Sequence, residues 1–250
     1  MKFDSIGDRM KDYESVPKTR LMPKSPVLAR LDGRAFHTLT KKMRRPYDAR
    51  FHRCMQEAAI HLCGGISGCQ VAYVQSDEIT LLLLDTRTYT TQAWFDNEVQ
   101  KMCSVAASMC SVAFYAAFLR EFEGDLPSKV LPTFDARFWN VPVHEVGNCL
   151  LWRQQDAERN SLTMAAQAHY SHKDLHGKGR SAKHDLLHAK GVNWNDLPTP
   201  QKRGVCIVKE EDTDTGRTRW VVDEDIPIFS TPEGRAYIER FLVQGGPDPA

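Results

Sequence analysis

The sequence predicts an α+β protein built on a ferredoxin-like antiparallel sheet, the arrangement of the polymerase and cyclase palm. Up to residue 140 the apolar patterns follow the order strand, helix, strand, strand, helix, strand, which is that of the split βαβ motif. Two apolar runs flank the polar break Ser76-Asp-Glu78, as in a β-hairpin. We therefore expect two helices on one face of the sheet and the other face free for a substrate.

The first strand and the first long helix have clear boundaries. A short helix over residues 4–13 precedes them, and Val27, Leu28 and Leu31 then indicate a buried strand. Gly33 permits a tight turn after this strand. A helix opens after Pro46 and Asp48 and ends at Gly64-Gly65. Its apolar stripe consists of Phe51, Met55, Ala58, Ala59 and Leu62.

The hairpin occupies about residues 70–84, and the longest helical pattern follows over residues 94–122. Apolar residues recur through that pattern at helical spacing, which indicates a core helix. The run Gly124-Asp-Leu-Pro127 interrupts it, and residues 134–138 alternate between apolar and polar as in a strand. These elements complete a palm-like core over residues 1–140.

A helical and β-hairpin extension follows the core over residues 141–240. A helical pattern covers residues 143–170, a short helix ends at Lys190, and a hairpin over residues 204–222 turns at residues 212–216. We expect residues 241–250, which end in Gly245-Gly-Pro-Asp-Pro-Ala, to form a disordered tail.

Composition describes an ordinary soluble protein. The 250 residues carry a net charge of only +1, so binding to nucleic acid has to depend on a local basic patch. The charged start Met1-Lys-Phe-Asp predicts no signal peptide, and no apolar run is expected to approach the roughly 20 residues of a membrane span. Seven cysteines without a Cys-x-x-Cys pair indicate reduced thiols and a cytoplasmic protein without a membrane partner.

Two carboxylates mark the predicted active site. If the hairpin pairs with the first strand, Asp32 and Asp77 meet at one end of the sheet, as a two-metal phosphoryl-transfer site requires. A carboxylate beside a bare backbone carbonyl suits Mg²⁺, and Arg30, Arg34 and His37 are placed to hold phosphate oxygens.

The alternative for this stretch is an ordinary Asp-Gly turn with solvated arginines. Glu78 is next to Asp77 and points to the opposite face of its strand. It is either a group that supports the site or a solvated acid.

Four motifs together resemble the tRNA-histidine guanylyltransferase family over about residues 1–222. They are Arg30-Leu-Asp-Gly-Arg-Ala-Phe-His37, Gln75-Ser-Asp-Glu78, Phe134-Asp-Ala-Arg137 and Trp152-Arg-Gln-Gln-Asp156. The resemblance implies a palm-like fold, two Mg²⁺ ions, and ATP, GTP and other nucleoside triphosphates as substrates. It also implies nucleotide addition to the 5′ end of tRNA with growth from 3′ to 5′, and a homotetramer. The long apolar helix over residues 94–122 is a candidate for an interface in such a tetramer.

The resemblance further implies roles for individual residues. Asp32 and Asp77 would be catalytic and would bind the metal ions, with the Gly33 carbonyl as a third ligand. The extension would complete the active site and contact tRNA. The implied nucleotide-binding residues are Arg30, Asp32, Gly33, Arg34, Ala35, Phe36, His37, Arg45, Asp48, Ser76, Asp77, Asn160 and Lys183.

Three departures from the family pattern bear on specificity. Glu158 replaces a His of the guanylyltransferases, Arg45 replaces a Lys, and Glu98 replaces an Arg. These changes resemble the Thg1-like branch, which repairs tRNA 5′ ends against a template. We expect Arg153 or Arg159 to pair with Glu158 on the same helix.

Alternative functions remain open from the sequence. The protein could add an untemplated G to histidine tRNA, as the guanylyltransferases do. It could also use the same palm as a nucleotide cyclase, or bind RNA without catalysis.

Residues 169–190 combine five histidines with five basic residues. His184 and His188 are one helical turn apart, as in some zinc sites, but no cysteine cluster accompanies them. We therefore interpret the segment as a basic, RNA-facing one, with a solvated loop as the alternative.

Overall fold

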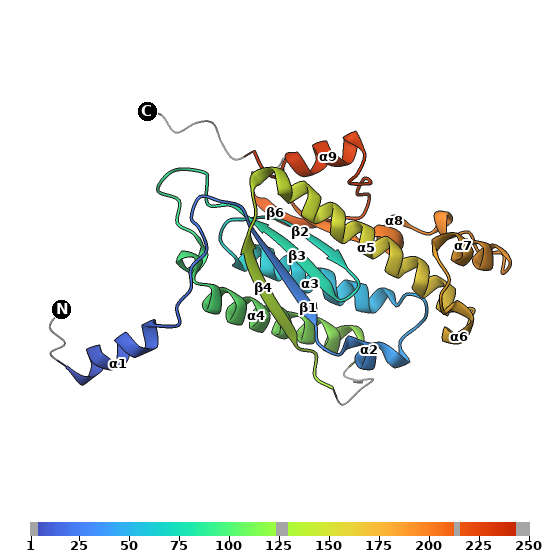
Figure 1. Ribbon diagram of the computed structural model, residues 1–250, viewed down its shortest axis with the longest axis horizontal. Coiled ribbons are helices and arrows are strands. Elements are labelled where there is room, and N and C mark those ends of the chain that lie inside the picture. The colour runs from blue at the N-terminus through green and yellow to red at the C-terminus, as the bar shows by residue number, and fades with distance from the viewer. Residues whose placement is uncertain (1–4, 124–129, 213–215, 244–250) are drawn as a thin grey trace.

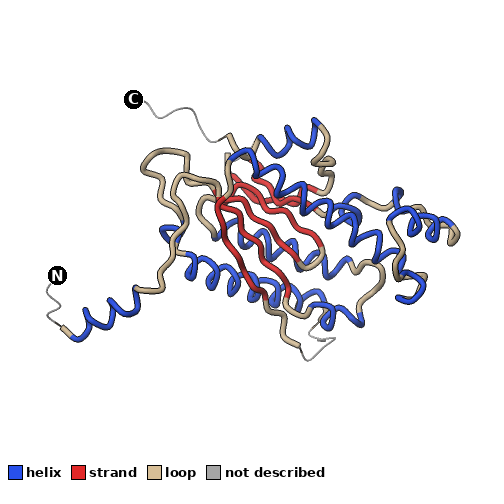
Figure 2. The backbone as a smooth tube through the Cα atoms, viewed as in Figure 1, coloured by secondary structure: helices blue, strands red, loops and turns tan. Residues whose placement is uncertain are grey.

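In the computed structural model, a six-stranded antiparallel sheet organises the chain (Figures 1 and 2). The structure describes residues 5–123, 130–212 and 216–243. The strand order is β4-β1-β3-β2-β5-β6, and its first four strands have the ferredoxin-like order. The predicted α+β class is therefore confirmed. The strands are β1 (Val27–Gly33), β2 (Cys69–Gln75), β3 (Glu78–Leu83), β4 (Phe134–Asn140), β5 (Val205–Glu211) and β6 (Thr218–Asp223).

Nine α-helices lie in the described part of the chain, and three of them are long. The long ones are α3 (Ala49–Gly65), α4 (Val99–Glu121) and α5 (Val146–Gln167). The others are α1 (Ile6–Ser15), α2 (Phe36–Leu39), α6 (His172–Leu175), α7 (Arg180–His188), α8 (Thr199–Arg203) and α9 (Pro232–Glu239).

The two faces of the sheet follow from the alternation of buried side chains. Ala29 and Leu31 of β1 contribute to the core under α3 and α4, whereas Leu28 contributes to a second core under α5. Figure 1 shows α3 and α4 on one face, as predicted, and α5 across the other. The expectation of a second face left free for a substrate is therefore wrong, because the extension covers it.

The C-terminal hairpin is part of the central sheet. β5 pairs antiparallel with β2 and β6 pairs with β5, so the boundary predicted at residue 140 does not separate two sheets. The turn predicted at residues 212–216 lies mostly outside the described residues, as does the break at residues 124–127. Phe241 and Leu242 pack on the α5-side core, although we expected a disordered tail from residue 241. Residues 244–250 of that tail are not described.

The predicted helix over residues 94–122 starts later than expected. Phe95, Asp96 and Asn97 have positive φ angles, so the regular helix α4 begins only at Val99. By length and composition α4 could cross a membrane, which corrects the expectation that no apolar run reaches that size. However, Met102, Ala106, Cys110 and Phe114 are fully buried in the core shared with α3 and the sheet, so α4 packs as a core helix of the domain.

A small lobe extends beyond the sheet at the end of α5. Its own core joins the C-terminal half of α5 to α6, α7 and a 3₁₀ helix at Trp194–Asp196. The residues of this core are Leu162, Ala165, Ala166, Leu175, Leu187 and Trp194. Figure 1 shows the lobe at one end of the molecule and α1 projecting at the other.

Candidate active site

The structure brings Asp32 and Asp77 to the same end of the sheet. Asp32 is the residue before the end of β1, and Asp77 lies in the two-residue turn between β2 and β3. The Gly33 N–H donates a hydrogen bond to the Asp77 carbonyl over 3.0 Å, and Asp32 is the register partner of Glu78. The strand pairing alone therefore places the two residues next to each other at this end of the sheet.

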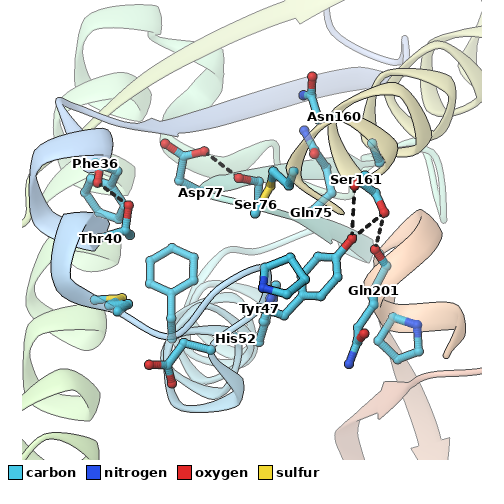
Figure 3. A pocket seen from close by; sticks show the side chains of 18 of the residues that line it. Phe36, Thr40, Tyr47, His52, Gln75, Ser76, Asp77, Asn160, Ser161 and Gln201 are labelled. Atoms are coloured by element: carbon cyan, nitrogen blue, oxygen red, sulfur yellow. Dashed lines mark hydrogen bonds between the residues drawn. The ribbon is translucent and has the colours of Figure 1, made fainter. Parts of the chain in front are cut away.

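The electrostatics of this pair favour a bound cation. Burial, the largest influence, raises the pKa of Asp77, and the neighbouring charge of Asp32 raises it further. The Ser76 hydroxyl donates to Asp77 Oδ1 over 3.0 Å and opposes that shift (Figure 3). A cation bound beside these residues would offset the negative charge of Asp32 and favour the ionised form of Asp77.

The donors present fit Mg²⁺. Asp32 and Asp77 offer carboxylate oxygens, and Gly33 offers a backbone carbonyl, all of them hard ligands. Within the described ranges, no three His, Cys, Asp or Glu side chains gather into a closed metal cage. This is the donor set expected for Mg²⁺, which keeps several waters and takes its remaining ligands from substrate phosphates.

A pocket of about 390 Å³ opens beside the carboxylates, between the segment from α2 to α3 on one side and α5 with α8 on the other. Lys41, Arg44 and Arg45 bring positive charge to it. The pocket is large enough for a nucleotide-sized ligand. Of the predicted site residues, those that line it are Phe36, His37, Arg45, Asp48, Ser76, Asp77 and Asn160. The predicted residues that do not are Arg30, Asp32, Gly33, Arg34, Ala35 and Lys183.

The turn after β1 depends on Phe36. Gly33 matters for close approach, because a Cβ atom there would lie 2.6 Å from Cγ of the Phe36 ring. The left-handed residue of the turn is Ala35, with φ of 57°. The buried Phe36 ring packs against Phe114 and Phe134, with centroids 5.3 and 5.0 Å away. The aromatic core thus anchors the loop that follows Asp32. In that loop Arg34 is exposed.

Asp48 is the N-cap of α3. Its Oδ1 accepts a hydrogen bond from the Arg50 N–H over 3.1 Å, and its carboxylate also binds the Arg50 guanidinium, over 3.0 and 2.7 Å. The bond with Arg50, the first cause, lowers the pKa of Asp48 to about 2. Asp48 therefore has a structural role at the pocket wall, beside any contact with a nucleotide.

A buried hydrogen-bond hub closes the pocket opposite Asp77. Ser161 Oγ lies 2.5 Å from the Tyr47 hydroxyl, 2.6 Å from the Gln201 carbonyl and 2.9 Å from Trp194 Nε1 (Figure 3). Because Ser161 has one hydroxyl proton, it donates to Gln201 and accepts from the other two. Sequence patterns did not predict this hub, since its members lie up to 154 residues apart along the chain with no shared motif.

Arg30 and Glu78 face α5 and not the pocket. Glu78 is buried, and Arg153 Nε lies 2.7 Å from its Oε1, so Glu78 is no solvated acid. Arg30 Nε is 3.9 Å from Glu78 Oε2, and its guanidinium lies over the Trp152 ring. Burial raises the pKa of Glu78, and Arg153 opposes this shift. The ion pair thus ties α5 to the residue opposite Asp32.

Glu158 has other partners than expected. Arg180 and Arg203 approach it to 3.7 and 4.0 Å, whereas Arg153 and Arg159 both bind Asp156. The predicted pairing is wrong because Arg153 and Arg159 are both engaged by Asp156, two residues before Glu158.

Lys183 lies in the lobe, where its Nζ donates to Thr163 Oγ1 over 2.9 Å. The predicted contact of Lys183 with a nucleotide stays a prediction.

Comparison with known proteins agrees with this geometry. A family model described as Thg1, tRNAHis guanylyltransferase, matches residues 7–142. A bacterial tRNA(His) guanylyltransferase (Thg1)-like protein solved in complex with ATP is 42% identical with a TM-score of 0.87, covering 96% of this chain and 100% of that one. Its GTP complex gives 42% identity and a TM-score of 0.83, covering 96% and 99%. A probable tRNA(His) guanylyltransferase of Dictyostelium discoideum is 28% identical, covering 84% of this chain and 88% of its own.

Proposed function

The chain belongs to the tRNA-histidine guanylyltransferase (Thg1) family of nucleotidyltransferases, and within that family we propose that it repairs tRNA 5′ ends. The reaction is template-dependent 3′–5′ addition of nucleotides to a truncated tRNA. The observation that carries the proposal is the carboxylate pair Asp32 and Asp77 beside a pocket with a basic rim. The similarity to a bacterial protein that binds ATP and GTP supports nucleoside triphosphates as its ligands.

The chemistry proceeds in two displacements. A 5′-monophosphate has no good leaving group, so its oxygen first attacks the α-phosphorus of ATP and releases pyrophosphate. The 3′-hydroxyl of an incoming nucleoside triphosphate then attacks the activated 5′-phosphorus, and AMP leaves. Each displacement exchanges one P–O bond for another, so atoms and charge balance.

The chain's own groups orient these reactants. Asp32, Asp77 and the Gly33 carbonyl would hold Mg²⁺, which when bound neutralises phosphate charge and activates the attacking hydroxyl. His37 and Arg45 line the pocket and can hold phosphate oxygens by charge-assisted hydrogen bonds. Phe36 keeps the loop after Asp32 in place through its aromatic contacts.

The departures from the guanylyltransferase pattern support templated addition. Glu158 stands where the family has a His, and here the carboxylate lies between Arg180 and Arg203 and does not line the pocket. We propose that base choice comes from Watson–Crick pairing with the opposite tRNA strand. The second candidate is addition of an untemplated G, which the names of the curated relatives favour.

A set of truncated tRNAs that differ only in the template base separates the two candidates. Each tRNA is incubated with one labelled nucleoside triphosphate, ATP for activation and Mg²⁺. We expect the added base to be the complement of the template base in every case. Addition of G whatever base lies opposite would contradict repair and favour the histidine-tRNA activity.

Two further predictions remain part of the proposal, one implied by the resemblance and one by the reduced cysteines. The enzyme would be a homotetramer, and it would act in the cytoplasm. Sedimentation of the purified protein tests the first, and fractionation of cells that express it tests the second.

A further inference from the structure

Positive charge is concentrated at the end of the molecule that carries the pocket. Residues 33–47 contain five basic side chains and no acid, and residues 169–190 contain five basic side chains and two acids. Together they hold ten of the chain's 33 basic side chains but only two of its 32 acidic ones. The remainder of the chain is therefore acidic overall, and the net charge of +1 conceals an uneven distribution of charge along the sequence.

The two basic segments have different positions relative to the pocket. Residues 33–47 supply part of its lining, including Lys41 and Arg45. Residues 169–190 form α6 and α7 in the lobe, next to Met164 and Gln167 of α5, which line the pocket from the other side. Figure 1 shows α2 and the α6–α7 lobe at the same end of the molecule. The basic lobe thus begins where the pocket ends.

The lobe is a folded support for its charges. Leu175 and Leu187 are buried against α5 and Trp194, and Ser171 caps α6 through a reciprocal hydrogen bond with Asp174. That bond engages the Asp174 carboxylate locally, with the Ser171 hydroxyl 2.6 Å away. One of the two acids in the segment is therefore occupied by a cap and does not bind a lysine directly.

Three lysines of the lobe are exposed and available. Lys173, Lys178 and Lys190 form no ion pair within the described residues, although Lys190 lies over the Tyr170 ring. By contrast, Arg180 faces Glu158 and Lys183 binds Thr163. Free, exposed lysines on a rigid support beside a phosphate-binding pocket are the arrangement that binds an RNA backbone.

We propose that the α6–α7 lobe is a docking surface for the phosphate backbone of the RNA duplex, with Lys173 and Lys178 as its principal contacts. This inference rests on the proposed function, because the 5′ nucleotide in the pocket places the rest of the RNA outside it. The lobe binds the phosphate backbone of the RNA away from its 5′ end. Residues 33–47 serve the nucleotide and the terminal phosphate. The lobe contributes to RNA affinity and not to the chemical step.

The test compares two matched double variants of the full chain. Lys173→Gln/Lys178→Gln removes two charges from the lobe, and Lys11→Gln/Lys18→Gln removes two exposed charges near α1, at the other end of the molecule. Fluorescence anisotropy with labelled 5′-truncated tRNA gives the Kd between 50 and 200 mM KCl. GTP binding and the steady-state constants for addition are measured on the same preparations.

We expect the lobe variant to weaken tRNA binding roughly tenfold near 0.15 M salt. The slope of log Kd against log salt should fall by about 1.5, because binding with two fewer phosphate contacts releases fewer counterions. Its KM for tRNA rises accordingly, whereas kcat and GTP binding stay at wild-type values. The α1 variant behaves as wild type.

An unchanged Kd in the lobe variant, or an equal loss in both variants, would overturn the docking surface. Wild-type protein that binds tRNA but adds no nucleotide would refute the proposed function and leave the binding comparison intact.

Discussion

The hydroxyl groups of Tyr47 and Ser161 lie 2.5 Å apart and join the loop before α3 to α5 across the pocket. Burial raises the pKa of Tyr47, so its phenol stays neutral and donates the hydrogen bond. The Ser161 hydroxyl also donates a hydrogen bond to the Gln201 carbonyl and accepts one from Trp194 Nε1. One side chain thus connects the pocket wall to α8 and to the core of the basic lobe.

Ser161→Ala should destabilise the protein by about 1–3 kcal/mol, because it leaves the Gln201 carbonyl and the Trp194 N–H without their partner. Urea unfolding measures the change. Ser104→Ala is the control, since that exposed hydroxyl bonds only a carbonyl of its own helix. Equal stability of the two variants would show that the hub contributes nothing.

Tyr47→Phe should raise the KM for nucleoside triphosphate more than it changes kcat.

Asp32→Asn and Asp77→Asn should each lower the rate of nucleotide addition by about 10³-fold or more, since either change removes a carboxylate that would hold the Mg²⁺ needed to neutralise the phosphates. Asp135→Asn is the matched control. Asp135 is the register partner of Asp32 on β4, but its carboxylate is exposed and lies 3.2 Å from Arg137. In single-turnover assays, this variant should add nucleotides at a rate close to that of wild type. Wild-type rates for Asp32→Asn with intact circular dichroism would exclude the carboxylate site.

The raised pKa of Asp77 makes a prediction about stability that does not depend on activity. The folded state binds the Asp77 proton more tightly than the unfolded state does. Asp77 therefore contributes stability at pH values below 3.8, its ordinary pKa, and this contribution is lost as the pH rises through the higher pKa of the folded state. Without metal, Asp77→Asn should therefore become more stable than wild type as pH rises above about 4. Urea unfolding in EDTA at several pH values measures this difference.

Adding Mg²⁺ should raise the free energy of unfolding of wild type, because a cation that binds only the folded state stabilises that state. The difference in unfolding free energy between wild type and Asp77→Asn should therefore become smaller. An unchanged difference with and without Mg²⁺ would argue against metal binding at these carboxylates.

The periodicity of apolar residues was enough to predict the sheet and the long helices. Strand β1 and the hairpin of β2 and β3 each have short apolar runs with clear breaks, so local pattern and tertiary pairing agree. The same pattern failed at Phe95, Asp96 and Asn97, which look helical by spacing but adopt positive φ. A backbone conformation of this kind depends on neighbouring segments, here through the backbone bond from Leu21 to the Asn97 carbonyl.

The candidate site was predictable where it follows from strand register and not where it follows from long-range contacts. Asp32 and Asp77 lie together because adjacent strands bring their ends together, and a motif in each strand marks the residue. The Tyr47–Ser161 bond joins segments 114 residues apart, and nothing in either segment specifies the other. Glu158 shows the same limit, since its partners Arg180 and Arg203 come from other elements.

The Glu78–Arg153 ion pair gives the last prediction. Its two side chains are only 10% and 6% exposed, and the Oε1–Nε distance is 2.7 Å. Arg153→Met leaves the buried Glu78 carboxylate with only Arg30, whose Nε is 3.9 Å away, so the substitution should cost about 3–5 kcal/mol in the free energy of unfolding. Arg159→Met is the control, because that guanidinium is 59% exposed and its bond to Asp156 should be worth less than about 1 kcal/mol.

The double variant Glu78→Gln/Arg153→Met distinguishes a specific pair from general damage to α5. If the pair is specific, the double variant should lose less stability than the two single variants together, by about 1–3 kcal/mol, since neither charge is then left alone. Additive losses would contradict the pairing. Because Glu78 is the register partner of Asp32, Arg153→Met should also lower nucleotide addition while RNA binding by the α6–α7 lobe persists. Loss of both properties together would instead indicate that α5 no longer packs on the sheet.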